Sequence, residues 1–211
     1  MLLNITALTK TYTISGKLIT ALNTVDLTFS KNSFTCIVGK SGCGKTTLLR
    51  LLSGLEPATS GTIDYGKAAK IGFVFQEPRL MPWLTVNANI AFAAKNDPSL
   101  PAAPDEKLLE LLGLKAFQHS FPAQLSGGMA QRTALGRTLF QNPDLILMDE
   151  PFSALDYFTR RSLQQMLLNL FQQQKKSVIF VTHDVEEALL LGQRILVMQE
   201  GRIKIDQRID M

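Results

Sequence analysis

Residues 39–46, Gly-Lys-Ser-Gly-Cys-Gly-Lys-Thr, place the strongest constraint on what this chain can fold into. They match the phosphate-loop pattern G-x-x-x-x-G-K-[ST] in full. An apolar run at residues 34–38 directly precedes them, and a helical pattern with leucines at 48, 49, 51 and 52 follows. A strand, a glycine-rich turn and a helix are therefore predicted in that order, which indicates an α/β protein.

The residue types of this loop suit a nucleoside triphosphate. The glycines allow backbone N–H groups to curl around phosphate oxygens, and the helix beginning at Lys45 directs the positive end of its dipole at the same anion. Lys45 is predicted to contact the β- and γ-phosphates, and the Thr46 hydroxyl to coordinate Mg²⁺. Cys43 is interpreted as a small spacer, with a reactive thiol as the alternative. The predicted nucleotide contacts of this segment are Gly39, Lys40, Ser41, Gly42, Cys43, Gly44, Lys45, Thr46 and Thr47.

Four apolar runs each stop at polar or glycine residues suited to phosphate, metal or water. They lie at residues 34–38, 71–75, 145–148 and 178–181, and the residues that follow are Gly39, Gln76, Asp149-Glu150 and Thr182-His183. Runs of this length suit strands buried on both faces of a largely parallel sheet. Because ligands of open α/β sheets bind beyond the carboxyl ends of the strands, these endings are predicted to form one site.

The rest of the chain supplies further elements. Residues 2–12 and 19–29 are expected to form antiparallel strands, and residues 194–205 a closing hairpin around Glu200-Gly201. Residues 155–174 predict a helix, because Leu163, Leu167, Leu170 and Phe171 lie on one stripe. Residues 77–140 are expected to be mostly helical, interrupted by a proline-rich loop at 97–104.

The pair Asp149-Glu150 is predicted to divide the chemistry. Asp149 ends a strand, as a Mg²⁺-binding aspartate does in phosphate-loop enzymes. Adjacent strand residues point in opposite directions, so Glu150 is free to polarise an attacking water. The alternative is an acidic pair that caps the next turn. The phosphate loop alone leaves kinases, GTPases and ATPases open, and the sequence has no Asn-Lys-x-Asp guanine reader.

Composition excludes several other classes. The formal charge is only +4, from 22 basic and 18 acidic residues spread along the chain, so nucleic acid is not an expected partner. The two cysteines, Cys36 and Cys43, predict no disulfide framework. No apolar stretch approaches the roughly 20 residues of a membrane helix, so any membrane role is expected to come through a partner.

The next motifs identify a family resemblance. Residues 125–129, Leu-Ser-Gly-Gly-Met, resemble the ABC signature Leu-Ser-Gly-Gly-Gln, and residues 153–156, Ser-Ala-Leu-Asp, resemble the D-loop. The chain resembles ABC ATPases over nearly its whole length, with the motifs in the family's order. The resemblance implies a mostly parallel core sheet, an N-terminal antiparallel β subdomain and an inserted helical subdomain at about 77–140. It implies one domain over residues 1–211. The chain ends soon after the predicted hairpin, so the C-terminal regulatory domain of some sugar-type importers is not expected.

The resemblance also assigns site residues. Gln76 resembles the Q-loop glutamine, which contacts Mg²⁺ or water, and His183 the switch histidine, which acts with Glu150 and Lys45 in catalysis. Tyr12 is placed as the aromatic that stacks on adenine, with a packing role as the alternative. The signature residues Ser126, Gly127 and Gly128 are expected to contact the nucleotide held by an opposite subunit. Asp156 of the D-loop is expected to contribute to the same nucleotide site. From its residues alone, Ser126 is also a good helix N-cap, which leaves a simple cap as the alternative.

Two features bear on which ABC protein this is. Residues 80–86, Leu-Met-Pro-Trp-Leu-Thr-Val, are similar to the ATPases of nitrate, sulfonate and taurine importers, and of importers of thiamine-pyrimidine precursors. Trp83 is then an interface anchor for a membrane subunit, or alternatively a buried tryptophan of the helical region. Met129 departs from the signature glutamine, which puts any contact of that side chain in doubt.

The function expected from this resemblance is ATP hydrolysis that energises uptake of a small solute. ATP and Mg²⁺ are the expected cofactors, and the expected place is the cytoplasmic face of a membrane. The expected partners are a second ATPase subunit, membrane permease subunits and, indirectly, a periplasmic-type solute-binding protein. The alternative is a non-transport ABC ATPase acting on nucleic acid or ribosomes. A catalytically inactive regulatory subunit is disfavoured, because Lys45, Asp149, Glu150 and His183 are all present.

Overall fold

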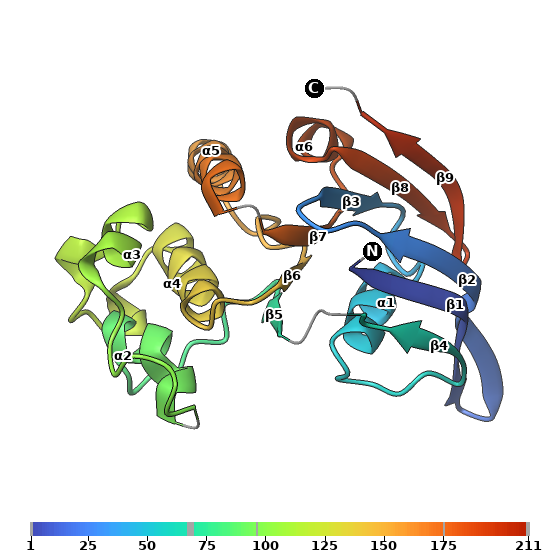
Figure 1. Cartoon of the computed structure of the whole chain (residues 1–211), viewed down its shortest axis with the longest axis horizontal. Coiled ribbons are helices and arrows are strands. Elements are labelled where there is room, and N and C mark those ends of the chain that lie inside the picture. Colours follow the sequence, from blue (N-terminus) through green and yellow to red (C-terminus); the bar gives the residue numbers. More distant parts are fainter. Residues whose placement is uncertain (1, 67–69, 96, 175, 210–211) are drawn as a thin grey trace. The chain divides into compact units, whose positions relative to one another are not determined.

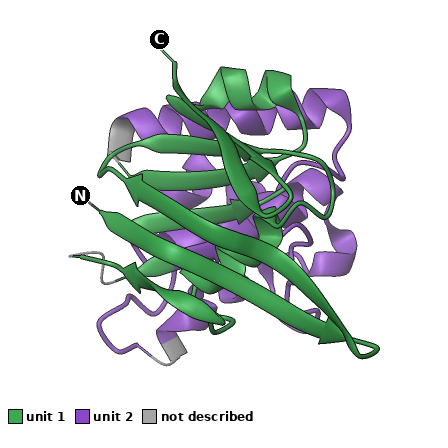
Figure 2. Ribbon diagram, turned by 90° about the vertical axis from the view of Figure 1, so that its right-hand side faces the viewer, with its two compact units in different colours: residues 1–71, 144–150, 175–211 green, residues 72–143, 151–174 purple. Residues whose placement is uncertain are grey.

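The computed structural model describes residues 2–66, 70–95, 97–174 and 176–209, and its chain divides into two compact units (Figures 1 and 2). Unit 1 comprises residues 1–71, 144–150 and 175–211, and unit 2 comprises residues 72–143 and 151–174. The strand β5 (Ile71–Val74) begins at the boundary between them.

An antiparallel sheet forms the N-terminal part of unit 1. Its strands are β1 (Leu3–Ile14), β2 (Lys17–Phe29) and β4 (Ser60–Asp64), in the order β2-β1-β4. The hairpin turn between β1 and β2 is Ser15-Gly16, with φ of 49° and 75°, as a tight two-residue turn requires. The predicted antiparallel strands are confirmed, and the hairpin extends further toward its turn than the sequence pattern indicated.

The second sheet of unit 1 contains the most completely buried strands. Its strands there are β3 (Phe34–Val38), β6 (Leu145–Asp149), β7 (Ser177–Thr182), β8 (Arg194–Gln199) and β9 (Arg202–Arg208), in the order β6-β7-β3-β8-β9. The first four of these run parallel, and β9 closes the edge as the antiparallel arm of the predicted hairpin. Every residue of β3, β6 and β7 is buried, which confirms the interpretation of their apolar runs.

The register of the parallel strands brings their carboxyl ends level. Val38 at the end of β3 pairs with Thr182 of β7, and Asp149 at the end of β6 pairs with Val181 of β7. The residues that follow these strands therefore emerge at one edge of the sheet. Gly39, Glu150 and His183, which are far apart in sequence, become neighbours for this reason.

Two helices complete unit 1. The helix α1 (Lys45–Leu52) buries four leucines and ends before Gly54, whose φ of 72° confirms the predicted stop. The helix α6 (Val185–Leu191) begins at Asp184, whose carboxylate accepts hydrogen bonds from the N–H groups of Glu186 and Glu187. Both helices thus start within a few residues of the end of a buried strand.

Unit 2 is largely helical. Its elements after β5 are α2 (Val86–Ile90), η1 (Ala91–Lys95), α3 (Glu106–Leu111), η2 (Lys115–Phe117), η3 (Pro122–Gln124), α4 (Gly127–Phe140) and α5 (Tyr157–Gln174). Side chains of Thr85, Asp105 and Ser126 cap the first turns of α2, α3 and α4. The predicted stripe of α5 is buried. Among the helices that the structure describes, none has the length and apolarity of a membrane-spanning segment.

A buried asparagine shapes the segment that carries Trp83. Asn89 is fully buried, and its Nδ2 donates to the carbonyl oxygens of Met81, Leu84 and Thr85 at 2.9–3.1 Å. Its Oδ1 accepts from the N–H of Met81 at 2.8 Å. The turn held in this way presents Trp83 with 69% of its surface exposed. The alternative of a tryptophan buried within the helical region is therefore wrong.

Candidate nucleotide site

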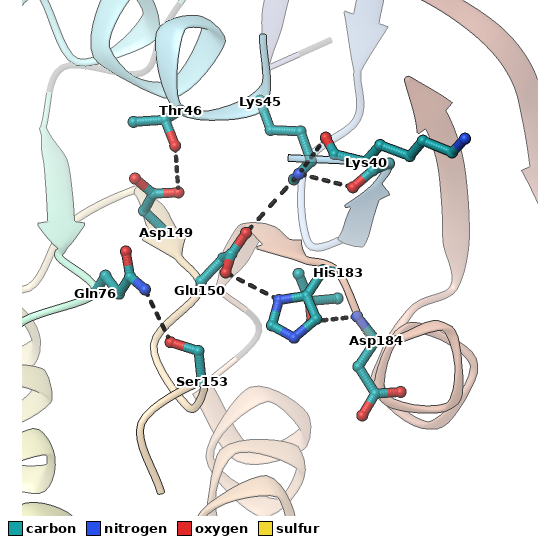
Figure 3. A network of polar contacts seen from close by, with 11 residues as sticks. Lys40, Lys45, Thr46, Gln76, Asp149, Glu150, Ser153, His183 and Asp184 are labelled. Atoms are coloured by element: carbon teal, nitrogen blue, oxygen red, sulfur yellow. Dashed lines mark hydrogen bonds and ion pairs between the residues drawn. The ribbon is translucent and has the colours of Figure 1, made fainter. Parts of the chain in front are cut away.

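Lys45 belongs to the polar cluster that Figure 3 shows, in which it contacts Glu150. Its Nζ donates to the carbonyl oxygens of Gly39 at 2.8 Å and Lys40 at 3.2 Å, and lies 3.8 Å from Oε1 of Glu150. Only 5% of the side chain is exposed. The Lys45 ammonium thus bonds to the backbone of its own loop. A bound phosphate could replace these carbonyl and carboxylate oxygens as its partner.

Close packing explains two glycines of the loop. A Cβ at Gly39 would lie 2.3 Å from the carbonyl oxygen of Met198 on β8, and a Cβ at Gly44 would lie 2.3 Å from that of Ala21 on β2. Gly44 also has φ of 108°, which an L side chain rarely adopts. The glycines that the sequence assigned to phosphate binding therefore also let the loop pack against both sheets of unit 1.

The other loop residues divide into an exposed and a buried group. Lys40, Ser41 and Gly42 are exposed, whereas Cys43 is buried. The N–H of Cys43 donates to the carbonyl of Lys40, and its carbonyl accepts from the N–H of Gly201. These backbone contacts and its burial favour the spacer interpretation of Cys43. Thr47 is half-buried, and its side chain opposes the rise in the pKa of Tyr12 that burial and Glu56 cause.

The predicted metal ligands Thr46 and Asp149 are hydrogen-bonded to each other. The Thr46 hydroxyl donates to Oδ1 of Asp149 at 3.0 Å, which brings a helix start and a strand end together. Burial raises the pKa of the Asp149 carboxyl, the hydrogen bond from Thr46 opposes this, and the neighbouring Glu150 carboxylate raises the pKa further. A divalent cation at this pair would offset the burial of the carboxylate.

Glu150 departs from the backbone expected of it. The strand β6 ends at Asp149, and Glu150 has φ of 43°, so strand alternation is the wrong reason for the separation of the two carboxylates. Its N–H still donates to the carbonyl of Val181 at 2.9 Å, which fixes the turn. A left-handed non-glycine residue stores strain, and such residues concentrate at functional sites. The two carboxylates nevertheless have different partners, Thr46 for Asp149 and Lys45 for Glu150.

His183 completes the cluster. Its Nδ1 lies 2.9 Å from Oε2 of Glu150, and 60% of the side chain is exposed. The loop that carries it is held by the hydroxyl of Thr182, which accepts from the N–H of Asp184 at 3.0 Å. The structure thus brings Lys45, Glu150 and His183 together in unit 1, with the Glu150 carboxylate between the Lys45 ammonium and the His183 imidazole.

Tyr12 lies on β1 with its hydroxyl directed at a residue that the sequence analysis missed. The hydroxyl donates to Oε2 of Glu56, and the N–H of Glu56 donates to the carbonyl of Arg50 in α1. No spacing in the sequence links Tyr12 to Glu56, since 44 residues separate them. Only the packing of α1 beside the antiparallel sheet makes the two neighbours.

The remaining site residues lie in unit 2. The Gln76 amide donates from Nε2 to the Ser153 hydroxyl at 3.2 Å, within the part of the network that Figure 3 draws from that unit. Ser126 caps α4 by accepting from the N–H of Met129 at 3.3 Å. Asp156 accepts from the N–H of Thr159 at 3.1 Å, and these contacts with Thr159 lower the pKa of its carboxyl.

The start of α4 is packed against the start of α5. A Cβ at Gly128 would lie 2.3 Å from Cγ2 of Thr159, whereas a Cβ at Gly127 would lie 3.6 Å from the nearest atom of Leu155. Ser126 and Gly127 are exposed and Gly128 is buried. The signature segment is therefore a capped helix start with small residues, and one of its glycines is required for packing as well.

Three polar side chains of α4 that the sequence analysis did not single out hold the segment containing Gln76. Gln131 donates to the carbonyl of Phe75, and Thr138 donates to that of Phe73. Arg137 donates to the carbonyl oxygens of Arg79 at 3.1 Å and Pro78 at 3.4 Å, and burial lowers the pKa of its guanidinium. Hydrogen bonds from α4 therefore hold the backbone of residues 73–79, the segment that contains Gln76.

The residues present fit a Mg²⁺–nucleotide complex. Within the described ranges, no three His, Cys, Asp or Glu side chains come together as a metal cluster. Mg²⁺ is normally held by one or two protein oxygens together with phosphate and water, which is the donor set that Thr46 and Asp149 supply. The buried ammonium of Lys45 and the exposed loop backbone provide the complementary positive groups.

A family model described as "ABC transporter" matches residues 22–153, which is more than half of the chain. The chain belongs to the ABC transporter family. This confirms the sequence-based identification and makes the protein an ATP-binding subunit whose activity is ATP hydrolysis. The ABC fold is confirmed as well, with an antiparallel sheet and a mixed, mostly parallel one.

Curated relatives and solved structures agree with this assignment. The chain is 47% identical to "Aliphatic sulfonates import ATP-binding protein SsuB 1" of Pseudomonas savastanoi pv. phaseolicola, covering 90% of this chain and 79% of that protein. It is 43% identical to "Aliphatic sulfonates import ATP-binding protein SsuB 2" of Burkholderia cenocepacia, covering 91% and 73%. A solved structure of the ATP-binding cassette MJ0796, described as a dimeric post-hydrolysis state bound to ADP and Pi, superposes with a TM-score of 0.86 at 31% identity, covering 99% of both chains.

Proposed function

We propose that this chain is the Mg²⁺-dependent ATPase subunit of a membrane importer, with Glu150 as general base and Lys45 and His183 as its catalytic partners. The observation that carries the proposal is the gathering of Lys45, Thr46, Asp149, Glu150 and His183 at one edge of the parallel sheet. In this proposal the phosphate-loop backbone at residues 39–47 cradles the phosphates, and Tyr12 contacts the base. The chain acts as a single ABC ATPase domain with a helical subdomain near residues 77–140.

The chemistry follows from the contacts of Glu150. When phosphate oxygens attract Lys45, the 3.8 Å contact between Lys45 and Glu150 weakens and the carboxylate becomes available to water. Glu150 takes the proton, the water oxygen forms a bond to the γ-phosphorus, and the bond to the β,γ-bridging oxygen breaks, which yields ADP and inorganic phosphate. His183, 2.9 Å from the carboxylate, orients it and faces the γ-phosphate.

The metal would be held by Thr46 and Asp149, with Gln76 as the expected further ligand or water contact. A bound Mg²⁺ supplies charge neutralisation for the phosphate oxygens and the leaving group. Thr46 donates to Asp149, so the two proposed ligands lie side by side. Gln76, bonded to Ser153, is positioned to report the state of the nucleotide through the segment that leads to Trp83.

A second copy of the chain is the proposed source of the remaining donors. Ser126, Gly127 and Gly128 form a helix start whose exposed part suits an anion, and Asp156 begins the neighbouring helix. In the proposed dimer, these residues meet the γ-phosphate bound to the partner's phosphate loop. The dimeric form of the structurally similar MJ0796 cassette supports this arrangement.

The importer assignment follows the relatives. Several that are 38–47% identical are named as aliphatic sulfonates import ATP-binding proteins, so a small sulfonate is the proposed cargo class. The proposed partners are permease subunits that contact the exposed Trp83 and, indirectly, a solute-binding protein. The proposed place is the cytoplasmic face of the membrane, through the permease. No observation favours the alternative of an ATPase acting on nucleic acid or ribosomes.

The decisive experiment is Glu150→Gln. The amide keeps the shape but cannot accept the proton, so we expect ATP binding within about threefold of the parent and turnover reduced at least about 100-fold. We also expect the variant to form an ATP-dependent dimer in size-exclusion chromatography. Glu106→Gln, at an exposed glutamate of α3, is the matched control and should retain full turnover. Equal turnover of Glu150→Gln and the parent would refute the role of Glu150.

The transport part of the proposal is tested separately. Affinity purification of the full chain from its source cells should retain a membrane protein with several spanning helices, and Trp83→Ala should weaken that association. Retention of ribosomes or nucleic acid as the main partner would support the alternative function.

A further inference from the structure

Glu56 joins β1 to the end of α1 through a cluster of four side chains in unit 1. Its Oε2 accepts a hydrogen bond from the Tyr12 hydroxyl, and its Oε1 accepts one from Nη1 of Arg50 at 3.1 Å. The ammonium of Lys10 lies 3.8 Å from the same carboxylate. Glu56 is therefore an ionised carboxylate whose two oxygens are both engaged, which is a more rigid arrangement than an isolated surface ion pair.

The Tyr12 ring is held at both ends by this arrangement. Its backbone lies in the β1 ladder, where Tyr12 pairs with Ile19 of β2, and its hydroxyl is anchored on Glu56. The Lys10 ammonium lies over the ring, 5.0 Å from its centroid, and is itself fixed by a 2.7 Å hydrogen bond to the carbonyl of Pro57. One face of the ring is thus covered by a cation, so a stacking partner would have to use the opposite face.

Glu56 also connects the ring to the phosphate loop. The N–H groups of Leu55 and Glu56 both donate to the carbonyl of Arg50, at 3.0 and 3.3 Å, so the residue is tied to the last turn of α1. The first turn of α1 carries Lys45 and Thr46. A short rigid path therefore runs from the Tyr12 hydroxyl through Glu56 and α1 to the residues that would hold the triphosphate.

We propose that Glu56 is a positioning residue for the nucleotide base, holding the Tyr12 ring at a fixed distance from the phosphate loop so that adenine stacks on the face opposite Lys10. The inference rests on the proposed nucleotide site and deepens it, because it names the group that orients the base contact. The pKa directions agree with this: the hydrogen bond from Tyr12 is the largest cause that lowers the pKa of Glu56, while burial and then Glu56 raise that of Tyr12.

The test compares two ligands that differ in the presence of a base. Binding of ATP and of inorganic tripolyphosphate, both with Mg²⁺, is measured by calorimetry for the full chain and for Tyr12→Phe, Glu56→Ala and the double variant. A single hydrogen bond of this kind corresponds to roughly a 3- to 10-fold change in affinity. We expect each single variant to bind ATP about 3- to 10-fold more weakly, and the double variant to bind no more weakly than the worse single one. Tripolyphosphate binding should stay within about twofold.

Two further variants separate positioning from general stability. Glu56→Gln keeps an oxygen acceptor for the Tyr12 hydroxyl, so it should recover most of the ATP affinity lost in Glu56→Ala. Glu110→Ala, which breaks an exposed ion pair with Lys115 in unit 2, should leave both ligands unaffected.

The outcomes distinguish this inference from the function on which it rests. Tyr12→Phe binding ATP as the parent does, additive losses in the double variant, or equal losses for tripolyphosphate would overturn the role of Glu56. In those cases the parent would still bind ATP and Lys45→Ala would still abolish it. A parent chain that binds neither ATP nor tripolyphosphate would overturn the proposed function and the inference together.

Discussion

A methyl group added at Gly128 would test whether the signature segment is also a packing element. The added Cβ would lie 2.3 Å from Cγ2 of Thr159, well inside the 3.5–4.0 Å of an ordinary carbon contact. Thr159 is β-branched, and its N–H is held by Asp156, so its methyl has little freedom to move away. The starts of α4 and α5 must separate to accept the change.

The magnitude comes from comparison with Gly127→Ala. Both substitutions are in the first turn of α4, so their effects on helix propensity cancel, and a Cβ at Gly127 makes only an ordinary 3.6 Å contact. Overpacking of this kind costs about 1–3 kcal/mol. For a chain of this size each kcal/mol shifts Tm by roughly 2–4 °C. We therefore expect Gly128→Ala to melt about 2–12 °C below Gly127→Ala.

The assay is thermal unfolding of the nucleotide-free protein by circular dichroism, with Thr159→Ser as the compensating change. Serine lacks the clashing methyl but keeps its N–H for Asp156, so Gly128→Ala combined with Thr159→Ser should recover most of the lost Tm. Equal melting of Gly127→Ala and Gly128→Ala, or no recovery in the double variant, would refute the packing argument.

Two other predictions address the turn before α2 and the closing hairpin. Asn89→Ala removes a fully buried side chain that bonds three carbonyl oxygens and one N–H, so it should destabilise unit 2 by about 2–4 kcal/mol and speed hydrogen exchange of residues 81–85; unchanged exchange would contradict it. In the hairpin, the hydrogen bonds from Arg194 lower the pKa of Asp206, so the stability they contribute is present above the unfolded pKa of about 3.9 and is lost as pH falls through the folded value. Asp206→Asn should therefore melt about 1–3 °C below the parent at pH 7. This difference in Tm should shrink as the pH falls below the unfolded pKa of about 3.9 and vanish once the pH is below the folded pKa of Asp206. A difference in Tm that does not depend on pH would contradict the assignment.

Much of the candidate site was predictable because its residues are local in sequence. The phosphate loop is a contiguous segment between a buried strand and a helix, so its spacing alone predicts which backbone groups and which lysine would face a phosphate. Asp149 and His183 were predictable for a related reason, since each follows an apolar run, and parallel strands end at one edge. The nearness of these strand ends needed the register, which pairs Val38 with Thr182 and Asp149 with Val181.

Other features depend on contacts between distant segments. Gly39 packs against Met198, and Tyr12 donates a hydrogen bond to Glu56, but nothing in these residue types indicates which partner each will meet. The positive φ of Glu150 was likewise not predictable from its residue type. Trp83 is a similar case, because the sequence is compatible with either an exposed or a buried indole. The hydrogen bonds of Asn89 hold the turn that exposes it.

The sequence by itself determined the strand–loop–helix order, the family and the identity of the charged groups, because periodicity and motif spacing are local properties of the chain. The tertiary structure decided which carboxylate meets Lys45, which glycines are sterically required and what anchors the Tyr12 ring. Those outcomes depend on the distances between side chains far apart in sequence, and such distances exist only once the strands have paired and the helices have packed.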